Sequence, residues 1–385
     1  MQIGIIGYGE RLSGFLDTIL KCANGQEVRI VAITEIDIEK AKKLLNQRGI
    51  NIANICFYSD ADEMLEKEKL DGVLIGTRCS SHTKMAVKVL AKNIALFLEK
   101  PVATNIEDLI ILKNATEKFK SEVVVSFPLR VTPIVKLVKE IIQSGKLGTI
   151  EHVQAINNVP YGGVYFHDWY RDENETGGLF LQKATHDLDC INYLLDLKPV
   201  IICAMKSKQI FKGNKPVGLL CKDCDEYETC PESPFVMKHS KYERVYGDMC
   251  CFAKDTGNQD SGSLLIKYET GMHVSYSQNF FARKSAAARG ARLLGYNGTL
   301  EFDFYKDEIK VFMHNTPRIE TYKTEFAKIF HWGGDEVLAY NFIKVMQGKE
   351  KSVAPIEAGL ISVLMCLKAE LSSQTDTFQN ISWDR

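Results

Sequence analysis

The chain has 385 residues and a formal net charge of −1, with 48 Lys and Arg residues against 49 Asp and Glu residues. This length is too great for one compact α/β unit and predicts two domains. The near-zero charge offers no basic surface for nucleic acid or for an anionic membrane, so neither partner is expected.

The lack of a recognisable targeting signal and the pattern of cysteine usage favour a cytoplasmic protein. No apolar run approaches the length of about 18 residues that a membrane span requires. The first residues, MQIGIIGYGE, lack the basic flank and the cleavage site of a signal peptide. Six of the 11 cysteines are scattered, as is typical of small buried hydrophobic residues in a reducing compartment: Cys22, Cys56, Cys79, Cys190, Cys203 and Cys366.

Residues 1–127 alternate short Val- and Ile-rich runs with longer amphipathic stretches. The short runs are QIGIIGYG, VRIVAITE, DGVLIGT, IALFLEKP and EVVVSFP. Runs that are apolar on both faces and separated by helices predict a parallel sheet covered on both sides. We therefore expect an α/β fold whose N-terminal part is a doubly wound Rossmann domain that binds NAD(P).

Residues 128–385 follow a different pattern and predict an α+β domain with a large, mainly antiparallel open sheet. Strands alternate about the turn ETG and about Asn297-Gly298, a strong hairpin signal. Two helices are expected between about Asp335 and Ser373, and residues 211–260 form an irregular, cysteine-rich loop. This domain would bind substrate, and its open sheet would pair subunits into a homodimer or homotetramer.

A glycine-rich turn follows the first predicted strand. Gly7 and Gly9 allow the backbone to turn tightly and to approach a pyrophosphate at the N-terminus of the next helix, although Leu12 replaces the third glycine of the fingerprint. Glu35 ends the second strand, where a carboxylate accepts hydrogen bonds from ribose hydroxyls and repels a 2′-phosphate. NAD is therefore favoured over NADP; the alternative is a glycine turn beside an exposed acid.

Four further motifs carry a family resemblance: Glu99-Lys100-Pro101, Phe127-Pro-Leu-Arg130 with Pro133, the link 144–149, and Gly177-Gly178 followed by His186. Over essentially its whole length the chain resembles the glucose-fructose oxidoreductase / inositol dehydrogenase (Gfo/Idh/MocA) family of NAD(P)-dependent dehydrogenases. The resemblance implies that Lys100 lies beside the nicotinamide and the substrate and that His186 belongs to the active site. It also implies a set of cofactor-binding residues: Gly7, Tyr8, Gly9, Glu35, Thr77, His82, Glu99, Lys100 and Arg130.

The sequence departs from the family pattern in two places. The Asp that family members usually carry four residues before the histidine is Gln182 here, and Lys183 follows it. The usual Thr-Pro-Asn segment after the fourth strand is Thr77-Arg78-Cys79, although Thr77 and His82 still match.

A helix that begins near Gly178 places Lys183, His186, Asp187 and Cys190 on one face. Oxidation of an alcohol needs a base near neutral pH, which imidazole provides. Lys100 would hydrogen-bond the reacting oxygen and stabilise the developing negative charge. Two neighbouring ammonium groups lower each other's pKa, so Lys100 or Lys183 can serve as the base instead. The alternative for Lys183 and Asp187 is a solvated helix face.

An aromatic segment, residues 161–171, precedes this helix and is a candidate for binding a sugar ring. The predicted substrate contacts are Tyr161, His167, Trp169 and Asp187. The alternative is an aromatic cluster that caps the sheet. His331-Trp-Gly-Gly334 is a second turn of this kind.

The cysteine-rich loop contains Cys221-Lys-Asp-Cys224 and Cys230, with Cys250-Cys251 farther along the chain. This spacing predicts a structural zinc site formed by Cys221, Cys224, Cys230 and Cys251. Simple thiols, a redox disulfide and an iron–sulfur cluster are the alternatives.

The leading functional hypothesis is an oxidoreductase that transfers hydride between NAD(P) and a secondary hydroxyl of a sugar, sugar acid or cyclitol. Lys100, His186 and Lys183 would be its catalytic residues. A second hypothesis is a redox-neutral enzyme that cleaves glycosides or epimerises sugars with tightly held NAD. A third is a non-catalytic NAD-binding sensor.

Overall fold

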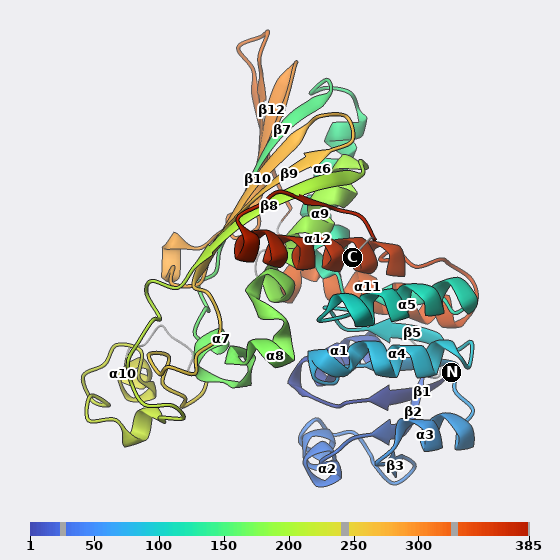
Figure 1. Cartoon of the computed structure of the whole chain (residues 1–385). Coiled ribbons are helices and arrows are strands. Elements are labelled where there is room, and N and C mark those ends of the chain that lie inside the picture. The colour runs from blue at the N-terminus through green and yellow to red at the C-terminus, as the bar shows by residue number, and fades with distance from the viewer. Residues whose placement is uncertain (24–27, 240–245, 325–329, 384–385) are drawn as a thin grey trace.

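The computed structural model describes residues 1–23, 28–239, 246–324 and 330–383 (Figure 1). Two sheets dominate the fold, one of six parallel strands and one of nine mostly antiparallel strands. The predicted fold class is therefore confirmed. No helix in the described ranges is both long and apolar enough to cross a membrane.

The first sheet has the strand order β3-β2-β1-β4-β5-β6 and is parallel throughout. Its strands β1, β4, β5 and β6 are largely buried on both faces, which is why they are continuous apolar runs in the sequence. The short strand β3 is the one that the sequence pattern did not indicate. The strands are β1 (Gln2–Ile6), β2 (Arg29–Thr34), β3 (Cys56–Tyr58), β4 (Gly72–Ile75), β5 (Ala95–Leu98) and β6 (Val123–Val125).

Helices connect these strands and cover the sheet, as the alternating pattern predicted. The helices are α1 (Glu10–Cys22), α2 (Ile38–Gln47), α3 (Ala61–Lys67), α4 (His82–Leu90) and α5 (Ile106–Lys118), with the 3₁₀ turn η1 (Cys79–Ser81) before α4. The 3₁₀ turn η2 (Pro128–Val131) and α6 (Pro133–Gln143) then lead into the second sheet. The C-terminal ends of β1, β4 and β5 meet at one edge, where a doubly wound sheet binds its ligand.

The second sheet has the order β14-β13-β12-β11-β7-β10-β9-β8-β15, and all its pairs are antiparallel except β7 with β10. Both predicted hairpins are present, and Gly298 belongs to the second strand of its hairpin rather than to the turn. The strands are β7 (Ile150–Asn158), β8 (Pro199–Ser207), β9 (Ser261–Tyr268), β10 (His273–Asn279), β11 (Ala288–Gly295), β12 (Gly298–Asp303), β13 (Glu308–Met313), β14 (Ile319–Lys323) and β15 (Gln379–Asn380).

The helices of the second half join the two sheets. Between β7 and β8 lie α7 (Val164–His167), η3 (Trp169–Arg171), α8 (Glu173–Thr176), a π-helical turn η4 (Phe180–Ala184) and α9 (Thr185–Leu195). The inserted loop carries η5 (Cys221–Asp223) and α10 (Pro234–His239), and η6 (Lys284–Ala286) precedes β11. After η7 (Phe330–Gly333), the chain ends with the two predicted helices, α11 (Gly334–Met346) and α12 (Ile356–Thr375).

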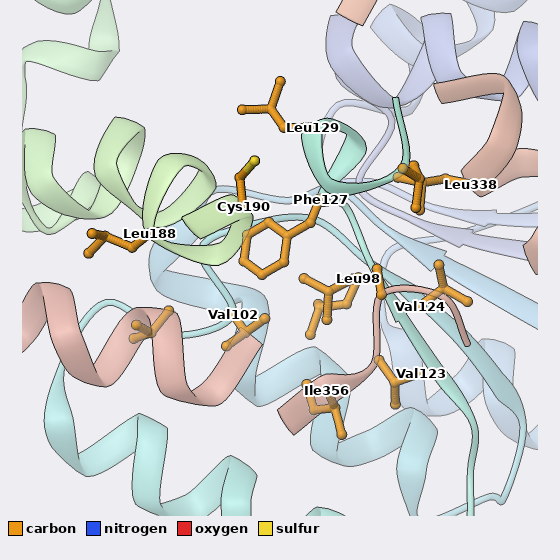
Figure 2. Packing of buried hydrophobic residues seen from close by; sticks show 14 of the residues in the cluster. Leu98, Val102, Val123, Val124, Phe127, Leu129, Leu188, Cys190, Leu338 and Ile356 are labelled. Carbon is orange, nitrogen blue, oxygen red and sulfur yellow. The ribbon is translucent and has the colours of Figure 1, made fainter. Parts of the chain in front are cut away.

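One apolar core runs through both sheets, because α11 and α12 return from the end of the chain to the Rossmann part. α11 packs on α1, and Phe342 contacts Phe97 of β5 with ring centroids 5.8 Å apart. The division at residues 127 and 128 remains a prediction about domains, since the core itself is continuous. Figure 2 shows this junction, with side chains from β5, β6, α9, α11 and α12 gathered around Phe127: Leu98, Val123, Val124, Leu188, Cys190, Leu338 and Ile356.

Candidate active site

The glycine turn lies at the C-terminal end of β1, directly against the loop that follows β4. Gly7 has φ +80°, and a Cβ there would come within 2.7 Å of the Thr77 backbone. Only glycine fits this position without strain or a clash. The Glu35 carboxylate accepts hydrogen bonds from the backbone N–H groups of Tyr8 (2.6 Å) and Ile36 (2.8 Å). The structure thus brings Gly7, Tyr8, Thr77 and Glu35 together.

The helix after this turn begins without a side-chain cap: in the described part of the chain, none hydrogen-bonds at the N-cap Gly9. Free N–H groups at a helix N-terminus are suited to a phosphate. A dinucleotide fits these three features: the tight Gly7–Gly9 turn, the uncapped N-terminus of α1 and the Glu35 carboxylate beside the turn.

His82 connects the loop at Thr77 with the loop at Pro101, next to the Gly7–Gly9 turn. Its Nδ1 lies 2.7 Å from the carbonyl oxygen of Pro101, and its Nε2 lies 3.2 Å from that of Thr77. The ring is buried, and burial lowers the pKa of His82. The contacts of His82 are therefore to the loops that would hold a cofactor.

Lys100 reaches from the Rossmann part to the second half of the chain. Its Nζ donates to the backbone carbonyl of Gln182 at 3.0 Å. Burial lowers the pKa of Lys100 to about 8, with Cys79 opposing this shift and Lys183 adding to it. The neighbouring Glu99 accepts from Ser126 at 3.0 Å and pairs with Arg11 at 3.2 Å.

Gln182 and Lys183 lie in the π-helical turn η4, which directly precedes α9. Gly177 and Gly178 both have positive φ, and a Cβ on Gly177 would meet the Leu181 side chain at 2.4 Å. π-helical turns often mark functional sites. Gln182 also donates from Nε2 to the Thr176 carbonyl at 2.8 Å, so its amide fixes the start of this turn.

Lys183 is buried, with 5% of its surface exposed, and its Nζ hydrogen-bonds the Tyr161 hydroxyl. The same atom lies 4.4 Å from the centroid of the Tyr161 ring and 5.7 Å from that of Tyr165. Burial, followed by the positive charge of Arg289, holds the pKa of Lys183 well below its usual range. Lys183 therefore loses its proton more readily than an exposed lysine does.

His186 follows in the first turn of α9, beside Phe127 with ring centroids 5.8 Å apart. Burial first, and then the charges of Lys100 and Arg289, hold the pKa of His186 well below its usual range. Its Nδ1 is buried without a hydrogen-bond partner among the described residues. A neutral imidazole thus stands near both lysines.

Asp187 is the centre of a buried polar network. It accepts hydrogen bonds from Arg289 Nε (2.7 Å), Asn157 Nδ2 (2.7 Å) and the Tyr276 hydroxyl (2.8 Å). Its partners come from three strands, so the network fixes α9 on the second sheet. The predicted substrate contact of Asp187 stays a prediction.

The idea that Lys183 and Asp187 lie on a solvated helix face is wrong. The exposed fraction of Asp187 is 8%, and every residue from Thr185 to Ile191 is buried. Cys190 packs in the apolar core instead of sharing a polar face with His186 (Figure 2). The helix is covered on both sides because the returning α12 packs against it.

The aromatic segment divides between two places. Tyr161 contacts Lys183, whereas the Trp169 ring stacks on Tyr170 (centroids 3.9 Å apart) and lies 3.6 Å from the Arg78 guanidinium carbon. Trp169 therefore contacts the Rossmann part, and its ring packs against both Tyr170 and Arg78. His167 Nδ1 lies 2.7 Å from the Met249 carbonyl oxygen of the inserted loop, and its predicted contact with substrate stays a prediction.

The turn at His331 approaches the site under backbone strain. His331 and Trp332 have φ +46° and +50°, which residues other than glycine rarely adopt and which often accompany functional sites. His331 Nδ1 lies 3.0 Å from Asp335, and Asp335 also binds Arg11 through two bonds. His331 contributes to the lowered pKa of His186 after burial and the nearer charges, which places it beside that ring.

Arg130 forms a bidentate ion pair with Asp189 of α9, at 2.6 and 2.9 Å. Both groups are buried, and burial raises the pKa of Asp189 to about 6 despite the neighbouring guanidinium. Arg130 also donates to the carbonyl of Val353 at 3.4 Å. It therefore anchors α9 in this structure, and its predicted contact with the cofactor stays a prediction.

The predicted zinc ligands are not gathered in the described structure. Cys221 and Cys250 pack with Ala253 in a small apolar cluster, and Cys224 and Cys230 are half-buried. A tetrahedral site needs all four thiols around one point. Within the described ranges, the one set of three or more ligand atoms that lie within 4.8 Å of one another belongs to His167, Glu232 and Cys251.

The sequence interpretation missed Arg289 and Tyr305. Arg289 lies on the same inward face of β11 as Ala291 and Leu293, and this period of two is the signal that could have placed its guanidinium in the core. Tyr305 is half-buried, and burial, followed by the charge of Tyr161, raises its pKa. No local motif marked Tyr305.

Comparisons with known proteins agree with this arrangement. Residues 1–127 match the oxidoreductase family with an NAD-binding Rossmann fold, and residues 135–227 match the GFO/IDH/MocA C-terminal domain. YteT of Bacillus subtilis (strain 168), which is assigned as an oxidoreductase, is 28% identical over 321 residues, 73% of this chain and 74% of that protein.

Other relatives match over less of their length or at lower identity. Myo-inositol 2-dehydrogenase of Thermotoga maritima is 24% identical over 195 residues, which is 51% of this chain and 55% of that protein. A solved levoglucosan dehydrogenase, in complex with NADH and levoglucosan, has the same fold, with a TM-score of 0.78 at 16% identity over 99% of both chains. The chain therefore belongs to the Gfo/Idh/MocA family of oxidoreductases.

Proposed function

We propose that this protein is an NAD-dependent dehydrogenase that acts on a secondary hydroxyl of a sugar, sugar acid or cyclitol. The observation that carries the proposal is the meeting of Lys100 with the helical turn that bears Lys183 and His186. Relatives named as inositol dehydrogenases and the levoglucosan dehydrogenase neighbour support a polyol or sugar substrate.

The residues present fit a dinucleotide at the Gly7–Gly9 turn. When bound, the nicotinamide of NAD would accept the hydride. Glu35 lies 2.6 Å from the Tyr8 amide, where its charge would bind ribose hydroxyls and repel a 2′-phosphate, which favours NAD over NADP.

The proton chemistry rests on the three buried basic groups. With a pKa of about 8, Lys100 is largely an ammonium at neutral pH and would hydrogen-bond the reacting oxygen. His186 is neutral there, because burial holds its pKa well below its usual range, and burial also lowers the pKa of Lys183 well below that of a free lysine. Either can take the hydroxyl proton, and Tyr161 orients the Lys183 amine.

A redox-neutral reaction is the second candidate. Tightly held NAD would oxidise the sugar transiently, and the Lys183–Tyr161 pair would then remove the neighbouring acidic proton. The buried contact between these two groups favours this alternative. Cofactor that co-purifies and never accumulates as NADH during turnover would distinguish it.

We also propose a homodimer or homotetramer that forms through the open face of the second sheet. Met205, Leu265 and Ile156 project from this face, with exposed fractions of 75%, 52% and 40%. Single exposed apolar residues are common, but several on one sheet face are typical of an interface. All 11 cysteines are unpaired thiols, which supports a reducing, cytoplasmic location.

The test is NADH formation with a panel of polyols, sugars and sugar acids. Lys100→Ala and His186→Ala should each lower kcat by about 10²–10⁴-fold, the range of a lost acid–base group. Lys349→Ala, at an exposed lysine, is the matched control and should leave kcat unchanged. Full turnover in both site variants would refute the assignment of these residues.

A further inference from the structure

The inserted loop contains little that would hold its shape. Its regular elements are the short η5 and α10, and its own apolar cluster contains only three fully buried residues among those described, Cys221, Cys250 and Ala253. Long loops with so small a core are usually stabilised by cross-links or metals. The loop meets the rest of the molecule at α7, through backbone and side-chain contacts between Met249 and His167.

At this contact His167 is held in one tautomer. Its Nδ1 lies 2.7 Å from the carbonyl oxygen of Met249, and its own carbonyl accepts from the Met249 N–H at 3.2 Å. A carbonyl oxygen only accepts, so Nδ1 carries a proton, and in the neutral ring Nε2 then presents its lone pair. This arrangement, with one ring nitrogen donating to a carbonyl, is how metal-binding histidines are generally oriented.

Nε2 of His167 is buried and has no hydrogen-bond partner in the described part of the chain. It faces the Glu232 carboxylate at 3.7 Å, which is too long for a hydrogen bond. A lone pair and a carboxylate oxygen repel one another unless a positive centre, either a proton or a metal ion, lies between them. His167 is 2% exposed, so bulk water does not provide that centre.

The Cys251 thiol completes the cluster. Its sulfur, His167 Nε2 and a Glu232 oxygen all lie within 4.8 Å of one another, and Cys251 is 1% exposed. Ligands at 2.0–2.3 Å from a tetrahedral zinc ion lie about 3.3–3.8 Å apart, so small side-chain shifts bring these atoms to a common centre. Arg283 Nη2 contacts both Glu232 oxygens at 3.2 Å and orients the carboxylate from outside.

We propose that His167 Nε2, the Glu232 carboxylate and the Cys251 thiolate bind a zinc ion that ties the inserted loop to α7. Imidazole, carboxylate and thiolate together are a donor set that zinc accepts readily. The thiol proton leaves to solvent on binding, and water fills the fourth position, on the side where Glu232 is partly exposed.

The role of this site is structural. Its ligands come from α7, from the segment before α10 and from the end of the loop, so one ion connects three distant parts of the sequence. α7 leads directly into Trp169, which lies under Arg78 of the Rossmann part. The zinc ion would therefore hold in place the segment that bridges the two halves of the chain.

Metal analysis of the purified full-length protein tests the proposal. After dialysis against zinc and removal of free metal, we expect about one zinc ion per chain. Cys251→Ser and His167→Gln should each reduce this to background. Cys203→Ser, at a half-buried thiol on β8, and Cys224→Ser, in the four-thiol set predicted from sequence, should both retain zinc.

X-ray absorption at the zinc edge of the wild-type protein keeps the test independent of variant folding. One sulfur at about 2.3 Å and the remaining ligands at about 2.0–2.2 Å are expected. Zinc-free wild-type protein, four sulfur ligands, or zinc that is lost with Cys224→Ser and kept with Cys251→Ser would each overturn the proposal. None of these results depends on the identity of the sugar substrate.

Discussion

Lys100 Nζ donates to the backbone carbonyl of Gln182 at 3.0 Å, so a residue from the end of β5 is bound to the turn that begins the α9 region. This contact joins the two halves of the chain at the candidate active site. Lys100 Nζ also lies 3.5 Å from Oε1 of the Gln182 side chain, whose Nε2 donates to the Thr176 carbonyl.

Replacement of Lys100 should change how stability depends on pH. Its pKa is about 8 in the folded protein and about 10.5 when unfolded, so between these values the unfolded chain binds more protons. The free energy of unfolding of the wild type, relative to Lys100→Met, should therefore rise by up to about 3 kcal/mol between pH 8 and pH 10.5. Denaturant titrations of both proteins across this range would measure it; parallel curves would contradict the burial of this amine.

The Arg130–Asp189 ion pair predicts a large loss of stability on removal of one partner. Arg130→Met leaves a buried carboxylate without its counter-charge and should lower the free energy of unfolding by about 3–5 kcal/mol. The double variant Arg130→Met/Asp189→Leu should recover most of this loss, because both charges are gone. Equal destabilisation of the two proteins in a denaturant titration would argue against the pair.

Cofactor preference should respond to Glu35. In Glu35→Ser the charge that opposes a 2′-phosphate is absent, so the ratio of NADP to NAD affinity should rise about 10- to 100-fold, or about 1.4–2.8 kcal/mol. Binding of each cofactor, followed by fluorescence titration, measures this ratio. Glu39→Gln, an exposed acidic residue on α2, is the control and should leave the ratio unchanged; an unaltered ratio in Glu35→Ser would remove the basis for favouring NAD.

The open face of the second sheet predicts the assembly state. Met205→Lys combined with Leu265→Lys places two charges on this face and should convert an oligomer into monomers, as measured by light scattering after size-exclusion chromatography. Ile111→Lys alters a comparably exposed apolar residue on α5 and should leave the oligomer intact. A wild type that is already monomeric would exclude this interface.

The sequence was most informative where local patterns determine structure. Continuous apolar runs predicted five of the six parallel strands, and only β3 escaped, because this edge strand is partly exposed, whereas the equally short β6 is a buried run of valines. The glycine turn and the Glu99-Lys100-Pro101 motif indicated where a cofactor and a reactive lysine belong, since tight turns and helix starts depend on neighbouring residues.

Tertiary structure alone decided which polar groups are buried and with what partners. α9 reads as an amphipathic helix, yet the return of α12 covers it, so Asp187 becomes the centre of a network and Cys190 a core residue. Likewise, cysteine spacing indicated four thiols, whereas the fold places Cys251 beside His167 and Glu232. These contacts join residues that are 65 or more positions apart or come from different elements, and no local spacing encodes such a distance.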